Sequence, residues 1–210
     1  MSKDKLALLF INPYYGESYE LGKAVENDGE LFADRLTQLG YRVERFIDCS
    51  AREFINSILR ESKRSHEMLL IYYSGHGASL HDWSGDEQDG RDEAFVFRDG
   101  YVVDDEAERL VKDNNCEQVI LISDCCHSGT IWDDAVTGNV CSISACSDNE
   151  TAKQTTFHSK RSISHGVLTY YFWKYYDCCK GNLQSLIATI NPIMKRYNQR
   201  AIMRGAPHSL

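Results

Sequence analysis

Residues 119–130 read VILISDCCHSGT, an apolar run that ends in two cysteines, a histidine, a serine and a glycine. Short apolar runs bounded by turn residues predict buried strands. A second run of this kind, MLLIYYSG (68–75), leads directly into His76 and Gly77. Because the carboxyl ends of parallel strands form the binding crevice of an open α/β sheet, we expect these two loops to meet at one edge.

Two earlier runs, LALLFI (6–11) and YRVERF (41–46), also predict strands. Apolar residues at helical spacing predict a helix over 21–39 between them and a second helix that begins at Ser50 as its N-cap. A third helix is expected to follow Asp104 and Asp105, whose carboxylates suit a helix start. Strands that alternate with helices in this way are typical of an α/β fold. The sequence therefore predicts a mostly parallel central sheet with helices on both faces.

The middle of the chain interrupts this alternation. Two β-rich runs in AFVFRDGYVV (94–103) flank Asp99-Gly100, a strong hairpin signal, and predict a small β-hairpin beside the main sheet. NVCSISACS (139–147) predicts a further strand. The polar stretch 147–165 has no apolar period and predicts a surface loop.

The last part of the chain is predicted to be helical. Apolar and aromatic residues follow helical spacing over 166–178 and again over 182–190, where Pro192 is expected to end the second helix. The sequence shows no internal repeat and no linker-like stretch. Its 210 residues suit one domain that spans 1–210.

The balance of charge argues against a nucleic-acid partner. The chain has 31 acidic and 23 basic residues, a net charge of -8, and an acidic surface repels a phosphate backbone. The same excess favours cations as partners, either the basic side chains of a protein substrate or a metal ion.

Neither a membrane nor a disulfide framework is expected. The apolar run near the start is too short for a signal peptide, and no later run is long enough to cross a bilayer. The eight cysteines include no C-x-x-C pair, so we expect free thiols in a soluble protein of a reducing compartment, the cytoplasm.

The cysteines and histidines at the two strand ends suggest nucleophilic catalysis. A thiol nucleophile needs an imidazole close by, and that imidazole normally comes from elsewhere in the chain. His76 is therefore a better partner than His127, which adjoins the cysteines and need not face a thiol. The backbone amides of Gly77 and Cys126 are candidates to stabilise an oxyanion. A single histidine after a strand is more often structural, and a buried cysteine is more often inert, so the prediction rests on their combination.

The segments YYSGHG (72–77) and SDCCHSGT (123–130) together resemble the caspase-homology peptidases, and within them the metacaspases, whose patterns are Y-S-G-H-G and D-x-C-H-S-G. A histidine about 50 residues before the cysteine is also a caspase feature. The resemblance runs from INPYYG (11–16) to GVLTYYF (166–172) and covers most of the chain. It implies a caspase-like fold and a minimal family member without a long N-terminal extension.

The resemblance also assigns roles to individual residues. The family pattern makes Cys126 the nucleophile, since this cysteine directly precedes His-Ser-Gly, and makes His76 its partner in a Cys-His dyad. Metacaspases are typically monomeric, so a monomer that acts on protein substrates is expected. The rival interpretation is a non-catalytic caspase-fold module, for interaction or calcium sensing, whose cysteine is vestigial.

A carboxylate near the nucleophile predicts the substrate. Asp124 stands two residues before Cys126, and a carboxylate there attracts Lys or, through paired hydrogen bonds, Arg. The resemblance adds Asp28, of the segment VEND, as a second carboxylate of the primary specificity pocket, and it implies cleavage after Arg or Lys. Without the resemblance, Asp28 would be interpreted as an exposed helix residue. Cleavage after Asp is disfavoured because such a pocket repels acidic side chains.

Acidic residues are concentrated in SGDEQDGRDE (84–93) and in two later Asp pairs, and oxygen ligands of this kind suit Ca²⁺. The run does not fit an EF-hand, because no glutamate stands at the twelfth loop position. Resemblance to calcium-activated metacaspases implies activation by Ca²⁺ and selects four ligands, Asp92, Asp104, Asp105 and Asp133. The alternative is a solvated acidic loop followed by a helix start.

A zinc site is an alternative for the residues at the strand ends. The candidate ligands are His76, Cys125, Cys126 and His127. Structural zinc sites usually show spaced ligand pairs, which this stretch lacks. We therefore expect Zn²⁺ to act as an inhibitor rather than as a cofactor.

Basic residues in the 147–165 loop predict a site of self-cleavage. An Arg- or Lys-specific protease would cut itself there after Lys153, Lys160 or Arg161. The alternative is a basic surface loop that is never cut.

Overall fold

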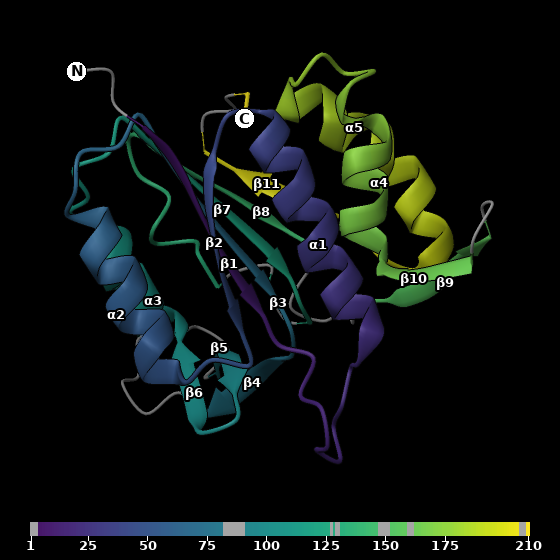
Figure 1. Ribbon diagram of the computed structural model, residues 1–210, viewed down its shortest axis with the longest axis horizontal. Coiled ribbons are helices and arrows are strands. Elements are labelled where there is room, and N and C mark those ends of the chain that lie inside the picture. Colours follow the sequence, from purple (N-terminus) through teal and green to yellow (C-terminus); the bar gives the residue numbers. More distant parts are fainter. Residues whose placement is uncertain are drawn as a thin grey trace.

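A six-stranded sheet crosses the middle of the molecule (Figure 1). The computed structural model describes residues 4–81, 91–126, 128, 131–146, 152–158, 162–205 and 209–210. In spatial order, the strands of the sheet are β11 (Ile202–Arg204), β8 (Val140–Ser144), β7 (Gln118–Asp124), β3 (Met68–Ser74), β1 (Lys5–Ile11) and β2 (Arg42–Ile47). Neighbouring strands from β8 to β2 pair in parallel, and β11 is antiparallel to β8.

Helices cover both faces of this sheet (Figure 1). The helices on one face are α1 (Lys23–Gln38), α4 (Val167–Tyr176) and α5 (Leu183–Met194), which the short helix η1 (Lys195–Tyr197) follows. The helices on the other face are α2 (Ala51–Ser62) and α3 (Asp104–Val111). Within the described residues, no helix has the length and apolar character needed to span a lipid bilayer. The arrangement confirms the predicted α/β fold.

The central strands are apolar on both sides because each side meets a helical layer. In β3, Leu70 and Tyr72 belong to the core beneath α1 and α4, whereas Leu69 and Tyr73 belong to the core beneath α2 and α3. Every residue of β3 and of β7 is buried. This double burial explains why the two strands form uninterrupted apolar runs in the sequence.

The predicted hairpin over 94–103 is confirmed as β5 (Arg91–Phe97) and β6 (Gly100–Val103). A third strand, β4 (Gly77–His81), pairs antiparallel with β5 and completes a small separate sheet. The sequence did not predict β4. It begins immediately after His76, so this small sheet anchors the chain that leaves the histidine loop.

The other predicted elements are confirmed, with ends shifted by a few residues. Ser50 caps α2 as expected, since its hydroxyl oxygen accepts a hydrogen bond from the Glu53 backbone N–H at 3.1 Å. The first helix begins at Lys23 rather than at position 21. Gly22, immediately before it, has a φ of 64°, which is outside the helical range.

The prediction of a surface loop over 147–165 is wrong for the part that the structure describes. β9 (Gln154–His158) and β10 (Ser162–Gly166) pair as an antiparallel ribbon. Threonine and isoleucine favour strands, and a ribbon that lies on the surface needs no apolar period. Residues 147–151 and 159–161 of the predicted loop lie outside the described ranges.

The prediction that Pro192 ends the last helix is also wrong, because α5 continues through it to Met194. Proline removes one backbone donor, and here the loss falls in the last turn of the helix. The end of the helix is held by Asn191, whose side chain donates to the Ala201 carbonyl at 3.0 Å and accepts from the Ala201 N–H at 2.8 Å. These bonds also place the chain for β11, a strand too short to leave a pattern in the sequence.

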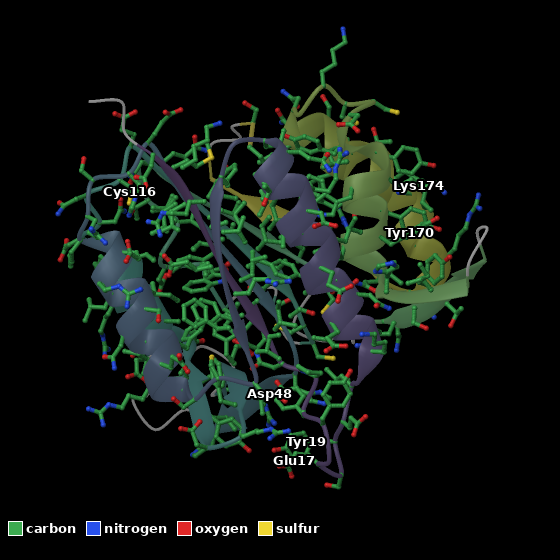
Figure 2. All side chains as sticks on the ribbon, in the orientation of Figure 1. Glu17, Tyr19, Asp48, Cys116, Tyr170 and Lys174 are labelled. Carbon is green, nitrogen blue, oxygen red and sulfur yellow. The ribbon has the colours of Figure 1, made fainter. Side chains whose placement is uncertain are left out.

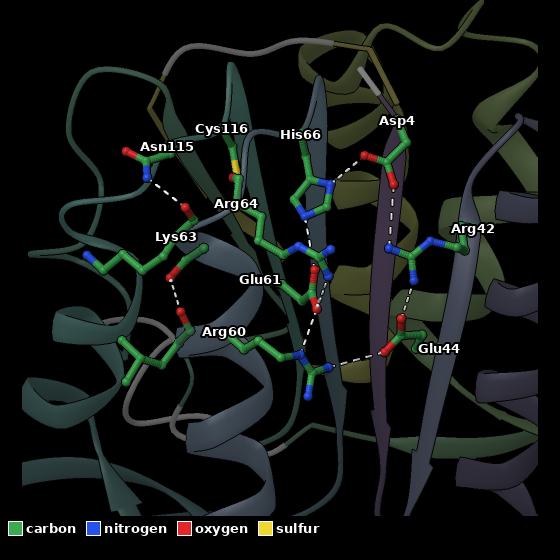
Figure 3. A network of polar contacts seen from close by, with 12 residues as sticks. Asp4, Arg42, Glu44, Arg60, Glu61, Lys63, Arg64, His66, Asn115 and Cys116 are labelled. Atoms are coloured by element: carbon green, nitrogen blue, oxygen red, sulfur yellow. Dashed lines mark hydrogen bonds and ion pairs between the residues drawn. The ribbon is translucent and has the colours of Figure 1, made fainter. Parts of the chain in front are cut away.

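A polar network closes the edge of the sheet where β3 begins (Figure 3). Nδ1 of His66 lies 2.6 Å from Oδ1 of Asp4, and Nε2 lies 3.1 Å from Oε2 of Glu61. Arg60 and Arg64 also donate to the Glu61 carboxylate, at 2.7 and 3.4 Å. The network ties the end of α2 to the start of β1, at the opposite end of β3 from the predicted catalytic loops.

Candidate active site

The two predicted catalytic loops leave neighbouring strands side by side. β3 and β7 pair in parallel with Ser74 opposite Asp124, the last residue of each strand. The 75–77 loop and the 125–126 pair therefore emerge next to each other at the carboxyl edge of the sheet. This register brings the two motifs together, as the sequence predicts.

Gly77 allows the two loops to touch. A side chain at this position would place its Cβ 1.9 Å from the carbonyl oxygen of Cys126. Nonbonded heavy atoms do not approach so closely, so only glycine fits between this loop and the cysteine. The backbone that carries His76 is therefore in direct contact with the backbone of Cys126.

A cavity of about 200 Å³ opens between these loops. Its lining contains all four side chains that the sequence assigned to catalysis and to substrate binding, namely His76, Cys126, Asp28 and Asp124. The rest of the lining comes from Leu21, Ser74, Gly75, Gly166 and residues 152–154. Segments far apart in the sequence thus converge on one small pocket.

The two adjacent cysteines occupy different environments. Cys125 is 1% exposed and belongs to the core beneath α2 and α3, whereas Cys126 is half-buried and lines the cavity. Burial raises the pKa of the Cys126 thiol, while a hydrogen bond from the Ala152 backbone and the charge of Lys153 lower it. Cys126 is the thiol that a molecule in the cavity can reach.

The imidazole of His76 is oriented by a backbone carbonyl. Its Nε2 atom lies 2.7 Å from the carbonyl oxygen of Tyr19, which lies in the segment before α1 (Figure 2). A carbonyl oxygen can only accept a hydrogen bond, so Nε2 carries the proton. Nδ1 is then the nitrogen with a lone pair, available to take a proton from a thiol.

The backbone of His76 is clamped by two tyrosine hydroxyls. Its N–H donates to Oη of Tyr14 at 2.9 Å, and its carbonyl oxygen accepts from Oη of Tyr73 at 2.8 Å. Tyr14 has a φ of 53°, and Asp48 accepts its backbone N–H at 2.9 Å. These contacts fix the position of the histidine from three separate segments of the chain.

Asp28 is buried at 1% exposure, which contradicts its interpretation as an exposed helix residue. Its Oδ1 atom lies 2.8 Å from Nδ1 of His165, and its Oδ2 atom accepts from the Gly166 backbone N–H at 2.8 Å. Burial raises the pKa of Asp28 to about 7, and the nearby charge of Asp124 adds to the rise. The two hydrogen bonds oppose it.

The carboxylates of Asp124 and Asp28 lie close together, beside Gly166. Oδ2 of Asp124 accepts hydrogen bonds from the backbone N–H and the hydroxyl of Thr169, at 3.2 and 2.7 Å. A Cβ on Gly166 would lie 2.5 Å from this oxygen and 2.9 Å from Oδ2 of Asp28. Burial raises the pKa of Asp124 as well. The cavity therefore contains two carboxylates in close proximity, a concentration of negative charge that suits a cation.

A family model described as the caspase domain (Peptidase_C14) matches residues 4–206. The chain belongs to the caspase-domain family. Within this family, it is 26% identical to Metacaspase-3 of Arabidopsis thaliana over 82% of the chain and 59% of that protein. It is 33% identical to Metacaspase-1 of Ajellomyces capsulatus over 62% of the chain and 42% of that protein. These similarities confirm the resemblance to metacaspases, and the chain spans less than two thirds of the length of these relatives.

The caspase-domain fold is also found in a solved structure with a distant sequence. The crystal structure of protein GSU0716 from Geobacter sulfurreducens superposes with a TM-score of 0.77, at 21% identity, over 98% of this chain and 95% of that one. The similarity covers the central sheet and both helical layers. At this level of identity, it shows a common fold.

The four predicted calcium ligands do not form one cation site in this caspase-domain protein. Asp104 accepts the backbone N–H groups of Glu93 and Asp105, at 3.1 and 2.9 Å. Asp105 also pairs with Arg109 at 3.0 Å. The other two ligands, Asp92 and Asp133, lie on β5 and in the segment before β8, and Asp133 pairs with Arg204. In the part of the chain that the structure describes, no three His, Cys, Asp or Glu side chains are grouped to hold a metal ion. Most of the acidic run, residues 84–90, lies outside the described residues.

The predicted zinc ligands are likewise divided. His76 and Cys126 line the cavity, whereas Cys125 lies in the core. His127 lies outside the described residues, as does Gly129. The described residues thus offer two zinc ligands at this site, fewer than a structural site uses.

Sequence reasoning missed several contributors to the site. The Tyr19 carbonyl is a backbone atom and leaves no sequence signal. Tyr73 lies within the YYSGHG motif but reads as a buried strand residue. His165 could be assigned to the site only once the β9–β10 ribbon was known, because this ribbon places it against α1. Only the tertiary fold reveals these contacts.

Proposed function

We propose that this chain is a cysteine endopeptidase that cleaves proteins after Arg or Lys through a Cys-His dyad. The observation that carries the proposal is the cavity in which a thiol and an imidazole share one lining with two buried carboxylates. The thiol and the imidazole are the nucleophile and the base that hydrolysis of a peptide bond needs. The carboxylates suit a basic side chain.

In the proposed reaction, Nδ1 of His76 accepts the thiol proton as Sγ of Cys126 attacks the carbonyl carbon of the scissile bond. Because burial raises the pKa of this thiol, the resting group is a protonated thiol rather than a thiolate. The imidazolium then donates its proton to the leaving amine, and the acyl group stays on Sγ as a thioester. A water molecule, deprotonated by His76, hydrolyses the thioester and the thiol is restored.

The oxyanion of the tetrahedral intermediate is assigned to the backbone amides of Gly77 and Cys126. The contact between these two residues at the junction of the loops supports the assignment. Amide donors that are already in place when charge develops need no reorganisation during the reaction. One such donor typically contributes about 10² to 10³ in kcat.

Specificity is proposed to arise from the charge of the cavity. An arginine or lysine side chain that entered it would meet Asp28 and Asp124, and its positive charge would relieve their mutual repulsion. An aspartate side chain would add a third carboxylate and be rejected. The preference for a basic residue therefore follows from two buried groups of one sign.

The test is hydrolysis of matched fluorogenic peptides that end in Arg, Lys or Asp. We expect cleavage after Arg and Lys, none after Asp, and none by Cys126→Ala. Cys178→Ala, which removes an exposed thiol in the turn after α4, is the control and should retain full activity. Cleavage of the Asp peptide at the rate of the Arg peptide would contradict the specificity, and activity in Cys126→Ala would contradict the nucleophile.

Activation by Ca²⁺ is a separate proposal, and it requires Asp104, Asp105 and Asp133 to exchange their present protein partners for the ion. Calorimetry with millimolar Ca²⁺, together with activity in the presence of a chelator, tests it. Heat of binding and a chelator-sensitive rate are expected. No heat and an unchanged rate would remove calcium from the mechanism. Zn²⁺ is expected to inhibit by binding His76 and Cys126, and a chelator should reverse the inhibition.

Self-cleavage is proposed at Lys153, which adjoins β9 and lines the cavity. Its N–H donates to Oε1 of Gln199 at 3.0 Å, and its carbonyl oxygen accepts from the Val167 N–H at 2.9 Å. Cleavage there requires these bonds to break first. Lys160 and Arg161 lie outside the described residues. Intact mass after incubation, compared with Cys126→Ala, distinguishes self-cleavage from a chain that is never cut.

A non-catalytic caspase-fold module is the second candidate function, and the raised pKa of Cys126 is the observation that favours it. A vestigial thiol should react with iodoacetamide no faster than an ordinary one. We expect Cys126 to react faster than the exposed Cys178, because His76 can accept its proton. Equal or slower labelling would favour the module.

A further inference from the structure

His165 reaches the cavity from β10, outside the set of residues that the motifs identify. Its Nδ1 atom lies 2.8 Å from Oδ1 of Asp28. The side chain of His165 is 12% exposed and that of Asp28 is 1% exposed, so the contact is sheltered from water. A hydrogen bond between titratable groups is stronger in such surroundings than at the surface.

The two carboxylates of the cavity have different hydrogen-bond donors. Within the described ranges, Asp28 contacts the His165 ring and the Gly166 backbone N–H, whereas Asp124 accepts from the N–H and hydroxyl of Thr169. Among the described residues, no Lys or Arg forms an ion pair with either carboxylate. Within that part of the chain, His165 is the basic side chain in hydrogen-bond contact with Asp28.

Two buried carboxylates in close proximity do not both ionise freely. The Oδ2 atoms of Asp28 and Asp124 would lie 2.9 and 2.5 Å from one and the same Cβ position on Gly166. Burial raises the pKa of Asp28 to about 7, and the hydrogen bond from His165 is the largest opposing influence. Loss of that bond would favour a neutral Asp28, which attracts cations less.

We propose that His165 is a positioning residue of the pocket for basic side chains, which keeps the Asp28 carboxylate ionised and oriented toward the cavity. The inference rests on the proposed function, because it concerns the pocket that would receive an arginine or lysine side chain. At low pH, Asp28 is protonated and the cavity is less negative. Binding of a basic side chain therefore strengthens as the pH rises and Asp28 releases its proton.

Other titratable groups surround the pair. Asp124, His76, Cys126 and Lys153 line the same cavity. Tyr72 of β3 is fully buried near Asp28 with a pKa well above its ordinary value, and stays neutral. The ring of Tyr170, beside Lys174 on α4 (Figure 2), lies 6.0 Å from the His165 ring. Because His76 and Cys126 also affect catalysis, the proposal is best tested by binding rather than by turnover.

The test is the binding of benzamidinium, a small amidinium ion that stays charged, measured by calorimetry between pH 6 and 9. Wild-type affinity should rise across this range. His165→Ala should bind about fivefold more weakly at pH 7, because a rise of about one unit from a pKa of about 7 lowers the ionised fraction of Asp28 from about one half to about one tenth, and should recover by pH 9. His165→Gln keeps an N–H donor for Asp28 and should lie closer to the wild type.

Wild-type affinity in His165→Ala at every pH would overturn the proposal. A uniform loss of affinity, with no change in the shape of the pH profile, would also overturn it, since that result indicates that His165 only holds β10 against α1. Failure of the wild-type chain to bind benzamidinium would overturn the proposed pocket together with this inference. Binding that is lost in Asp28→Asn but unchanged in His165→Ala would overturn the inference alone.

Discussion

The close contact between the two loops at Gly77 predicts the effect of an alanine there. The new Cβ would lie 1.9 Å from the Cys126 carbonyl oxygen, whereas real Cβ atoms essentially never approach within 3.0 Å. One loop must therefore move by about 1 Å relative to the other. A displacement of about 1 Å between reacting groups typically costs about 10² in rate. We expect kcat of Gly77→Ala on an arginine peptide to fall about a hundredfold.

The same variant should remain folded. Overpacking typically destabilises a protein by about 1–3 kcal/mol, and for a chain of this size each kcal/mol lowers Tm by about 2–4 °C. Gly77 is not among the residues with positive φ, so the loss comes from the steric clash and not from backbone strain. The assay is steady-state hydrolysis of the arginine peptide beside thermal unfolding.

Gly40→Ala is the matched control for this experiment. A Cβ at Gly40 meets no atom within 4 Å, but the backbone φ is 85°, so the substitution strains the backbone far from the site. We expect a lower Tm with an unchanged kcat. A kcat of Gly77→Ala within twofold of the wild type would refute the reasoning about the loop contact.

The remaining predictions concern three other groups of contacts. Asp4 has a lowered pKa, chiefly through its hydrogen bond with His66, and Glu61 has a lowered pKa because hydrogen bonds from Arg60 and His66 outweigh its burial. A carboxylate whose pKa is lower in the folded than in the unfolded state stabilises the fold above its unfolded-state pKa, and this stability is lost as the pH falls through its folded-state pKa. Tm should therefore drop in acid below about pH 4. His66→Ala should be less stable at pH 7 by about 1.5–3 kcal/mol, and an equal Tm would contradict this. Tyr14→Phe removes the acceptor for the His76 N–H and should lower kcat about two- to tenfold in steady-state kinetics. An unchanged kcat would argue against the role of the tyrosine hydroxyls in holding His76. Gly166→Ala displaces both cavity carboxylates and should raise KM for an arginine peptide more than it lowers kcat. A larger effect on kcat than on KM would be evidence against a role of the carboxylates in binding.

Burial decides which parts of the fold could be predicted from the sequence. β3 and β7 are buried along their whole length, so their sequences had to be apolar and were recognised as strands. The β9–β10 ribbon lies on the surface and has no such constraint. Pro192 was given too much weight because its effect on a helix depends on its distance from the helix end.

The residues of the candidate site also differ in whether they could be predicted from the sequence. His76 and Cys126 follow strands whose ends could be predicted, so their proximity was predicted as well. Asp28 was reached by resemblance, because an aspartate in a helix is usually exposed and only the packing of α1 against β10 and α4 buries it. His165 could not be found without that same packing. Proximity that follows from the pairing of buried parallel strands can thus be predicted from sequence, whereas contacts that depend on how a helix packs against a surface ribbon cannot.

The most direct test of the proposed peptidase site compares two peptide chloromethyl ketones, one ending in Arg and one in Asp, with peptide mapping of the alkylated thiols. The thiol sulfur displaces chloride from such a reagent, so the modified cysteine identifies the nucleophile and the peptide identifies the pocket. We predict that the arginyl reagent modifies Cys126 faster than any other thiol, and that the aspartyl reagent does not. Equal modification by both reagents, or modification of the exposed Cys178 with Cys126 intact, would contradict the assignment.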